Sequence, residues 1–318
     1  TLELARKLRR GDTLFIYGSQ RFIATAGSIY TFIHSVVMRN KTVIYIQGGA
    51  FDVYFNSQNA LVRSAIAFCL NRASYLGVQT WLLRDSLSPR FSNLVVIPNW
   101  VDISYISEAS GAQHCNDEIT KSNEEFRLCF IGEVIPEKGI IDLLEAFNKA
   151  VSALESEKVS LRLDIFGPTR DRSRDYVINA IASQSGKVLY HGYISNTALM
   201  AYLKGCSALV LPTKFPTEGY PGVIIEAMAM GIPVIATRHR AIPEIVVDGL
   251  NGILVEKGDI NGLKEAILRI VMEKDAYNYM ALNARKTAEK FDVNVVLRNM
   301  CVAFELPHRN DKQLYNND

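Results

Sequence analysis

Two carboxylates eight positions apart are the residues of this sequence whose type and spacing most directly suggest chemistry. Glu218 lies in a loop rich in Gly and Pro, and Glu226 follows about one turn into a short helix that Pro221 and Gly222 open. The first turn of such a helix has N–H groups without intrahelical acceptors, at the positive end of the helix dipole, so it attracts an anion. A carboxylate repels a nearby phosphate unless it binds hydroxyl groups, so we interpret the pair as holding a sugar or a ribose.

The elements around this stretch predict where it lies. Residues 209–213 and 233–237 are apolar runs typical of buried strands, and a loop, a helix of about nine residues and a stop at Gly231 connect them into a βαβ unit. The loop after the first strand then lies at the carboxyl edge of a parallel sheet, where open α/β proteins bind ligands. The residues alone leave an alternative open, which is two ordinary surface and helix-face Glu residues in a parallel α/β protein.

The whole stretch, residues 217–237, reads TEGYPGVIIEAMAMGIPVIAT. It resembles the E-x7-E signature of retaining, nucleotide-sugar-dependent glycosyltransferases of the family 4 type. The resemblance implies that Glu218 contacts hydroxyl groups of the donor sugar and that Glu226 binds the nucleotide ribose. It also implies that the segment between them binds the donor diphosphate through its backbone: Gly219, Tyr220, Pro221, Gly222, Val223 and Ile224.

A second loop, residues 132–139, reads GEVIPEKG and resembles the G-R-x-x-x-E-K-G loop of the same family. The resemblance assigns Lys138 a catalytic role beside Glu218, because the matching Lys neutralises the donor diphosphate. Glu133 occupies the position of the family's Arg, a charge reversal that lowers anion affinity unless another cation compensates. Three residues on loops of the same sheet are candidates for that cation: Arg170, Arg172 and Lys214.

Three further donor-binding positions follow from the resemblance: Gly132, Gly167 and Tyr193. Gly167 ends a predicted strand in a turn similar to the family's I-x-G-x-G-P, and Tyr193 lies in the loop where backbone groups meet the nucleotide base. Residues 243–246, PEIV, resemble a helix start, which makes Glu244 a capping or packing residue.

Family members have the GT-B fold, in which two Rossmann-like domains have parallel sheets that face each other across a cleft. The alternation of strand and helix patterns along the chain agrees with such an α/β architecture. We expect an acceptor-side domain at 1–107, a linker at 108–125, a nucleotide-sugar domain at 126–290, a helix that crosses back to the first domain at 291–306, and a tail at 307–318. Because family members have additional βα units before the position of Thr1, the first domain is expected to be short at its N-terminus.

The pattern also predicts individual elements. In the first domain we expect strands at 13–17, 42–47, 80–83 and 94–97, helices at 21–38 and 58–72, and a linker or domain edge over 104–125. In the second we expect strands at 127–132, 161–167, 187–190, 209–213, 233–237 and 253–255. Its helices are expected at 140–151, 197–204, 260–273 and 276–290, followed by the crossing helix at 293–304.

Composition excludes several other classes of protein. A net charge of +2 over 318 residues gives no basic face for nucleic acid. The sequence has no D-x-D, H-E-x-x-H or Cys/His cluster, so we expect no metal and no cofactor, with the nucleotide sugar as substrate. Five Cys without C-x-x-C spacing predict a reduced, cytoplasmic chain, and no apolar stretch is long enough for a spanning helix.

The first ten residues, TLELARKLRR, form a basic amphipathic pattern. Such a segment can lie on anionic lipid, which would place the protein at the inner face of the cell membrane as a peripheral partner. A helix with one solvated basic face is the alternative.

The sequence thus predicts a metal-independent hexosyltransferase. It would transfer a sugar from a nucleoside-diphosphate donor to a saccharide or lipid-linked saccharide acceptor, with retention of configuration as the resemblance implies. Two alternatives stay open. The short first domain and Glu133 are compatible with an inactive nucleotide-sugar-binding protein, and a GT-B epimerase or phosphorylase would keep the fold and change the reaction.

Overall fold

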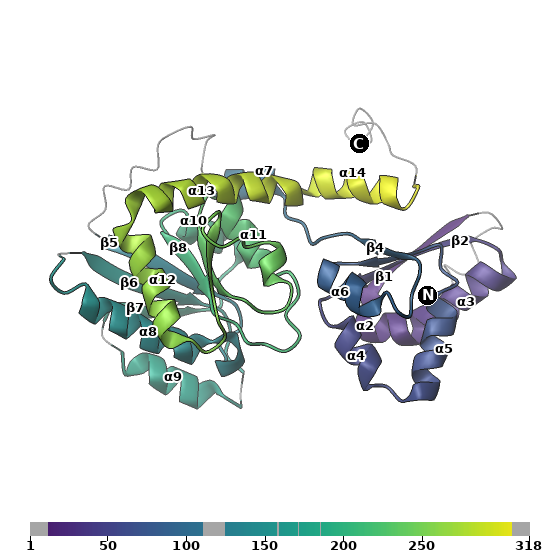
Figure 1. Ribbon diagram of the computed structural model, residues 1–318, viewed down its shortest axis with the longest axis horizontal. Helices are drawn as coiled ribbons and strands as arrows, with labels where there is room; N and C mark the ends of the chain where they lie inside the picture. Colours follow the sequence, from purple (N-terminus) through teal and green to yellow (C-terminus); the bar gives the residue numbers. More distant parts are fainter. Residues whose placement is uncertain (1–11, 111–124, 158, 171, 185, 307–318) are drawn as a thin grey trace. The chain divides into compact units, whose positions relative to one another are not determined.

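The computed structural model describes residues 12–110, 125–157, 159–170, 172–184 and 186–306, and the chain divides into two compact units (Figure 1). Unit 1 comprises Thr1–Asn99 and Asn294–Asp318, and unit 2 comprises Trp100–Val293. Each unit contains one parallel sheet, which confirms the predicted pair of α/β domains. The predicted basic segment at 1–10, most of the predicted linker and the predicted tail lie outside the described residues.

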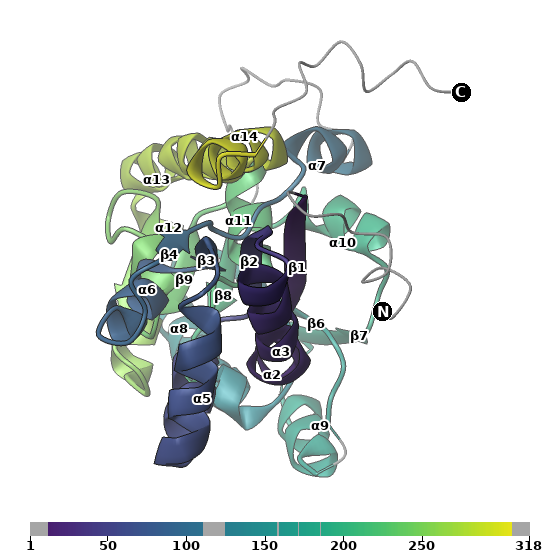
Figure 2. The same cartoon turned by 90° about the vertical axis from the view of Figure 1, so that its right-hand side faces the viewer.

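The sheet of unit 1 has four strands in sequence order. They are β1 (Thr13–Ser19), β2 (Lys41–Gln47), β3 (Tyr75–Val78) and β4 (Leu94–Val96). A helical run joins β1 to β2 through α2 (Gln20–Phe22), the π-helix η1 (Ile23–Gly27), α3 (Ser28–Phe32) and the π-helix η2 (Ile33–Val37). Between β2 and β3 lie α4 (Phe51–Ser57) and α5 (Ala60–Leu70), and α6 (Trp81–Leu87) follows β3. Figure 2 shows α3 and α5 side by side.

The core of unit 1 forms between its strands and these helices. Apolar side chains of β2, α4 and α5 bury together, among them Ile44, Ile46, Phe51 and Leu70. The last helix, α14 (Val293–Ala303), leads to the fully buried Phe304, whose ring lies 5.7 Å from that of Tyr75 in β3. Burial of apolar surface of this kind is the main source of folding free energy.

The prediction of a strand at 80–83 is wrong. The strand in this part of the chain is β3, which begins five residues earlier, and α6 begins at Trp81. Leu83 and Leu87, one helical turn apart, are both buried while Trp81 is 53% exposed, which is the period of a helix. The sequence pattern does not indicate β3, because Gly77 lies within it and glycine has low strand propensity. In the structure glycine is needed at this position, since a Cβ would lie 2.8 Å from the ring of Tyr45.

The start of α6 depends on the Thr80 side chain. Its hydroxyl oxygen accepts a hydrogen bond from the Leu83 N–H at 3.0 Å. We expect Thr80→Ala to lower the free energy of unfolding by about 1 kcal/mol, the usual cost of losing an N-cap. Urea unfolding checks this, with the exposed Ser88→Ala in the same segment as the control. An unchanged midpoint in both variants would contradict the capping role.

Two other expectations for this part of the chain need adjustment. The predicted helix at 58–72 is α5, and a separate helix, α4, precedes it. The predicted linker begins with a helix, α7 (Ile103–Ser110), whose first residues are held by the Asp102 carboxylate through the Tyr105 N–H at 2.9 Å. An Asp before a helix often accepts hydrogen bonds from backbone N–H groups of the first turn in this way. The sequence pattern does not predict α7, because its residues show no apolar period.

Unit 2 has a six-stranded sheet in the order β10-β9-β8-β5-β6-β7. Its strands are β5 (Glu125–Ile131), β6 (Ser160–Phe166), β7 (Val188–Gly192), β8 (Ala208–Leu211), β9 (Val234–Thr237) and β10 (Gly252–Val255). Each predicted strand of the second domain coincides with one of them to within about two residues, as expected for fully buried apolar runs.

Helices cover both faces of this sheet. The helices α8 (Ile140–Ala153), α9 (Arg174–Ala182) and α12 (Ile260–Met272) lie on one face (Figure 1). The helices α10 (Asn196–Leu203), α11 (Gly222–Ala229) and α13 (Lys274–Ala288) lie on the other. All of these except α9 are predicted from the sequence pattern. Within the described ranges, no helix is long and apolar enough to span a bilayer.

Candidate functional site

The order of the strands in unit 2 identifies one place at the sheet edge where a ligand fits best. From β5 the chain continues through β6 and β7 in one direction, whereas β8, β9 and β10 continue in the other. β5 and β8 are therefore neighbours whose following loops diverge, which is the topological switch point of an open α/β sheet. The crevice at their carboxyl ends is the expected ligand site.

The loop after β5 is fixed directly onto the end of β8. It contains the short 3-10 helix η3 (Pro136–Lys138) and then Gly139, whose φ of 80° lies in the left-handed region. A Cβ at Gly139 would lie 2.0 Å from the carbonyl oxygen of Pro212, so only glycine permits this approach. The Lys214 N–H also donates to the Glu137 carbonyl at 2.8 Å. These contacts place the Lys138 side chain beside the loop after β8.

Lys138 and Glu218, the two predicted catalytic residues, form an ion pair. The Lys138 Nζ lies 2.6 Å from Glu218 Oε2, and their side chains are only 15% and 8% exposed. The fully buried Thr213 hydroxyl donates to the same oxygen at 2.8 Å. The sequence analysis missed Thr213, although its position directly after a buried strand is a usable signal. The pair brings one cation and one carboxylate to the switch point.

The rest of the loop after β8 is held by the last residue of β9 and the residues just after it. The Arg240 Nε donates to the Glu218 carbonyl oxygen at 3.2 Å, and the His239 ring nitrogen Nε2 bonds the Phe215 carbonyl oxygen at 2.8 Å. The Thr237 hydroxyl donates to the Thr213 carbonyl oxygen. Sequence reasoning found none of these three contacts, because each joins residues more than twenty positions apart.

The predicted anion-binding segment begins α11. Pro221 is its N-cap, and Gly222 and Val223 are half-buried. Ile224 is fully buried and its N–H already donates to the Pro221 carbonyl oxygen at 3.0 Å, so the amides that can face a ligand are those of Gly222 and Val223. In the first turn of a helix, the N–H groups have no intrahelical acceptor and point outward along the positive end of the dipole. This geometry suits a phosphate group.

The second carboxylate of the signature, Glu226, lies within α11 and is half-buried. Burial raises the pKa of its carboxyl group, because the charged form loses hydration.

The buried Tyr220 hydroxyl donates to Glu244, and burial together with this acceptor raises the pKa of Tyr220. Glu244 therefore serves as the acceptor for Tyr220, in agreement with a packing role.

Glu133 is paired with one of the three candidate cations. The Arg170 guanidinium binds it through two bonds, with Nε–Oε1 at 3.1 Å and Nη2–Oε2 at 2.5 Å. Arg170 and Lys138 both lie over the ring of Phe215, at 5.7 and 5.0 Å from its centroid. Lys214, another of the three candidates, instead pairs with Asp142 at 2.9 Å. Arg170 is thus the neutralising residue.

Two of the three remaining predicted positions are in direct contact. Gly167, with φ of 130°, lies so near Gly132 that a Cβ would be 1.8 Å from the Gly132 carbonyl oxygen. Its N–H donates to Gly192 at 2.8 Å, which connects the ends of β6 and β7. Tyr193 follows Gly192 and its side chain is 80% exposed. The ends of β5, β6 and β7 thus carry a row of three glycines, Gly132, Gly167 and Gly192, at the carboxyl edge of the sheet. Within the described part of the chain, no group of three or more His, Cys, Asp or Glu side chains could hold a metal ion.

Solved structures of known proteins share this fold. HepE of Anabaena, whose crystal structure is in complex with UDP, superimposes with a TM-score of 0.72 at 20% identity, over 92% of this chain and 78% of HepE. An α,α-trehalose-phosphate synthase of Burkholderia xenovorans has a TM-score of 0.74 at 14% identity, over 96% of this chain and 76% of that one. These neighbours are GT-B glycosyltransferases, and the two parallel-sheet units have their fold.

Sequence relatives match just over half of this chain. The uncharacterized glycosyltransferase MJ1178 of Methanocaldococcus jannaschii is 30% identical over 177 residues, which are 55% of this chain and 47% of the relative. The capsular polysaccharide biosynthesis glycosyltransferase CapM of Staphylococcus aureus is 27% identical over 176 residues, 55% of this chain and 44% of CapM. The chain thus spans about half the length of these curated relatives.

A family model described as glycosyl transferases group 1 matches residues 115–287. The match contains β5 to β10 and both loops that form the Lys138–Glu218 pair. Because it spans more than half of the 318 residues, this chain belongs to the glycosyl transferases group 1 family.

Proposed function

We propose that the protein is a retaining hexosyltransferase of the family 4 type. It transfers a sugar from a nucleoside-diphosphate donor to a saccharide or lipid-linked saccharide acceptor. The observation that carries this proposal is the buried Lys138–Glu218 pair at the β5/β8 switch point, next to the first turn of α11. In this arrangement the Lys138 ammonium and the first-turn amides of α11 can bind a diphosphate, and the Glu218 carboxylate can bind sugar hydroxyls.

The chemistry needs stabilisation of a leaving diphosphate. The bond between the anomeric carbon and the diphosphate oxygen breaks, and the acceptor oxygen forms its bond to that carbon on the same face. The acceptor's proton passes to the leaving phosphate oxygen, so the reaction needs no protein nucleophile. Lys138 and the N–H groups of Gly222 and Val223 oppose the negative charge that develops on the diphosphate. Since these groups supply the charge, we propose that the reaction proceeds without a metal.

Glu218 positions the donor sugar in this scheme. Its Oε2 already accepts bonds from Lys138 and Thr213, and a carboxylate has further lone pairs that can accept from sugar hydroxyls. Glu226, on the same helix as the diphosphate site, binds the ribose hydroxyls. Gly132, Gly167 and Tyr193 form the surface on which the nucleoside lies.

The names of related proteins support the choice of substrates. HepE has been crystallised with UDP and with UDP-glucose, which favours a uridine nucleotide as donor. CapM acts in capsular polysaccharide biosynthesis and AmsK of Erwinia amylovora in amylovoran biosynthesis, which favours a growing polysaccharide as acceptor. We place the reaction in the cytoplasm, with residues 1–10 as the proposed contact with the membrane.

A thermal-shift panel tests the donor site. We expect UDP or UDP-hexose to raise the Tm in buffer with a chelator, because a ligand at about 100 times its Kd adds about 2.7 kcal/mol. GDP, ADP and CDP serve as the comparison. If no nucleotide changes the Tm, the chain has no donor site and the transferase proposal is wrong.

The Glu133–Arg170 pair allows a second test of the same site. Glu133→Arg places the family's usual cation there and frees Arg170, so we expect the affinity for inorganic pyrophosphate to rise about threefold to tenfold. The matched control is Glu137→Arg, an exposed position on the same loop. Isothermal titration calorimetry measures both. Equal gains in the two variants would show a general effect of net charge and contradict an anion site beside Glu133.

A further inference from the structure

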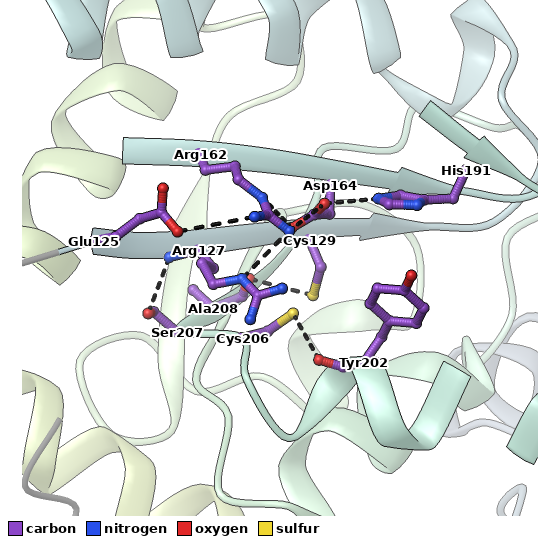
Figure 3. A network of polar contacts seen from close by, with 10 residues as sticks. All are labelled: Glu125, Arg127, Cys129, Arg162, Asp164, His191, Tyr202, Cys206, Ser207 and Ala208. Carbon is purple, nitrogen blue, oxygen red and sulfur yellow. Dashed lines mark hydrogen bonds and ion pairs between the residues drawn. The ribbon is translucent and has the colours of Figure 1, made fainter. Parts of the chain in front are cut away.

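One buried carboxylate connects three strands of unit 2. Asp164, in β6, is 1% exposed. Arg162, two residues earlier, binds both of its oxygens at 3.0 Å, and the His191 ring nitrogen Nε2 lies 2.7 Å from Oδ1. Arg127 in β5 approaches from the other side, with Nε 3.8 Å from Oδ2. Figure 3 shows the basic groups of β5, β6 and β7 converging on Asp164.

Such a group is costly to bury, because a carboxylate in the interior loses its hydration. The ion pair with Arg162 alone would compensate its charge. The contact with His191 adds something different, since it joins β6 to the last residues of β7. The His191 ring also stacks on Phe166 at 4.5 Å between centroids and an angle of 11°. Ring and hydrogen bond together fix the orientation of His191.

The fixed histidine immediately precedes the loop of the candidate site. The pairing of β6 and β7 shifts register between Ile165 and Phe166, so the ladder alone does not determine the path of the chain there. Gly192, with φ of 67°, follows His191 and accepts the bond from the Gly167 N–H at 2.8 Å. The Tyr190 hydroxyl also donates to the Gly167 carbonyl oxygen at 2.9 Å. Asp164, acting through His191, therefore helps these bonds to fix the backbone at Gly192 and the start of the loop at Tyr193.

The place of this loop in the sheet indicates which part of a ligand it meets. Neighbouring strands lie about 4.8 Å apart, so β7 is about 10 Å from β5, where the diphosphate would lie. Gly132 and Gly167 follow β5 and β6, and a Cβ at Gly132 would meet no atom within 4 Å, so this end of the sheet has open space for the nucleoside. A nucleoside that extends from β5 across the end of β6 would place its base next to Gly192 and Tyr193.

We propose that Asp164 and His191 are positioning residues for the nucleobase of the donor. This inference rests on the proposed function and deepens it. Neither residue touches the ligand. Asp164 orients His191, and His191 holds the backbone of the β7 loop in the conformation that accepts the base. The affinity for the nucleoside part depends on this pair, and the affinity for the diphosphate part does not.

The test compares two probes, UDP and inorganic pyrophosphate, by calorimetry on the full chain. His191→Phe keeps a ring to stack on Phe166 and removes the hydrogen bond to Asp164. We expect the Kd for UDP to rise about tenfold, as for loss of one hydrogen bond to a charged group, and the Kd for pyrophosphate to change less than about twofold. His191→Gln, whose amide can still donate to Asp164, should retain most of the UDP affinity.

A buried variant elsewhere in unit 2 controls for loss of stability. Val177→Ala removes apolar volume in α9, at a fully buried position outside the network. It should lower the Tm and leave both Kd values unchanged. Should the Phe variant fail to fold, hydrogen exchange of residues 188–193 in His191→Gln and wild type replaces it, with slow exchange expected in both.

The outcomes separate the two proposals. Equal weakening of UDP and pyrophosphate in His191→Phe, or no weakening of UDP, would overturn the positioning role and leave the donor site intact. Fast exchange of residues 188–193 in His191→Gln would also overturn it. If the wild-type chain binds neither probe, the proposed function itself fails.

Discussion

Replacing Lys138 with Met is expected to reduce the kcat of sugar transfer by about 10²–10³-fold, the usual loss when one group that stabilises developing negative charge is removed. The same change should lower the free energy of unfolding by about 3–5 kcal/mol, because it leaves the buried Glu218 carboxylate without its cation. The physical basis is the 2.6 Å contact between two side chains that are 15% and 8% exposed. Steady-state kinetics and urea unfolding measure the two effects.

A double-mutant cycle separates stability from catalysis. Adding Glu218→Gln to Lys138→Met removes the unpaired charge, so the unfolding free energy should recover while activity stays low. Lys149→Met is the matched control, since its side chain and that of its partner Glu145 are 43% and 52% exposed. An exposed pair contributes about 0–1 kcal/mol, so this variant should remain stable and active. If Lys138→Met retains kcat within about threefold, Lys138 has no role in the reaction.

Replacing Glu226 with Gln is expected to weaken nucleotide binding about tenfold to hundredfold, and at the same time to stabilise the free protein at neutral pH. The loss of affinity follows from removing charged hydrogen bonds to ribose. The gain in stability follows from burial, which raises the pKa of Glu226 above its ordinary value of 4.5. Above that value the folded state binds more protons than the unfolded state, so stability decreases as pH rises. Glutamine does not ionise and avoids this decrease.

The pH dependence of the unfolding free energy tests whether the ionised Glu226 destabilises the folded state. The difference in unfolding free energy between Glu226→Gln and wild type should increase as the pH rises above the ordinary pKa, and level off once the pH exceeds the raised pKa of the folded state. Urea unfolding at several pH values measures it, and calorimetry with UDP measures the affinity. Glu145→Gln is the control, because its side chain is 52% exposed and pairs with Lys149 in α8. A variant that binds UDP normally would contradict the ribose assignment, whatever its stability.

Much of unit 2 could be predicted from the sequence, because its strands are buried on both faces and therefore appear as short apolar runs. The runs LRLDIFG and LVLPT show where β6 and β8 lie, and the Gly-Pro loop before α11 shows where a helix begins. Strand order follows from the resemblance and not from any single run. In unit 1, Gly77 interrupts β3, and the apolar residues of α6 imitate a strand.

The contacts within the site are harder to predict, because they join distant parts of the chain. Lys138 and Glu218 are 80 positions apart, and Asp164 and His191 are 27 apart. The motifs indicate that each residue lies at the carboxyl edge, and only the strand order makes β5 and β8 neighbours. Arg170 was one of three candidates to neutralise Glu133, and the structure is needed to distinguish it from Lys214.

The most direct test of this account is hydrogen exchange of the full chain with and without saturating UDP, followed by mass spectrometry. A nucleotide at the β5/β8 switch point should slow exchange in residues 132–139, 191–194 and 217–226, which form the loops after β5, β7 and β8 and the start of α11. Residues of α12 and α13 should exchange at unchanged rates. Protection confined to other segments, or no protection at a UDP concentration that raises the Tm, would contradict a donor site built on Lys138 and Glu218.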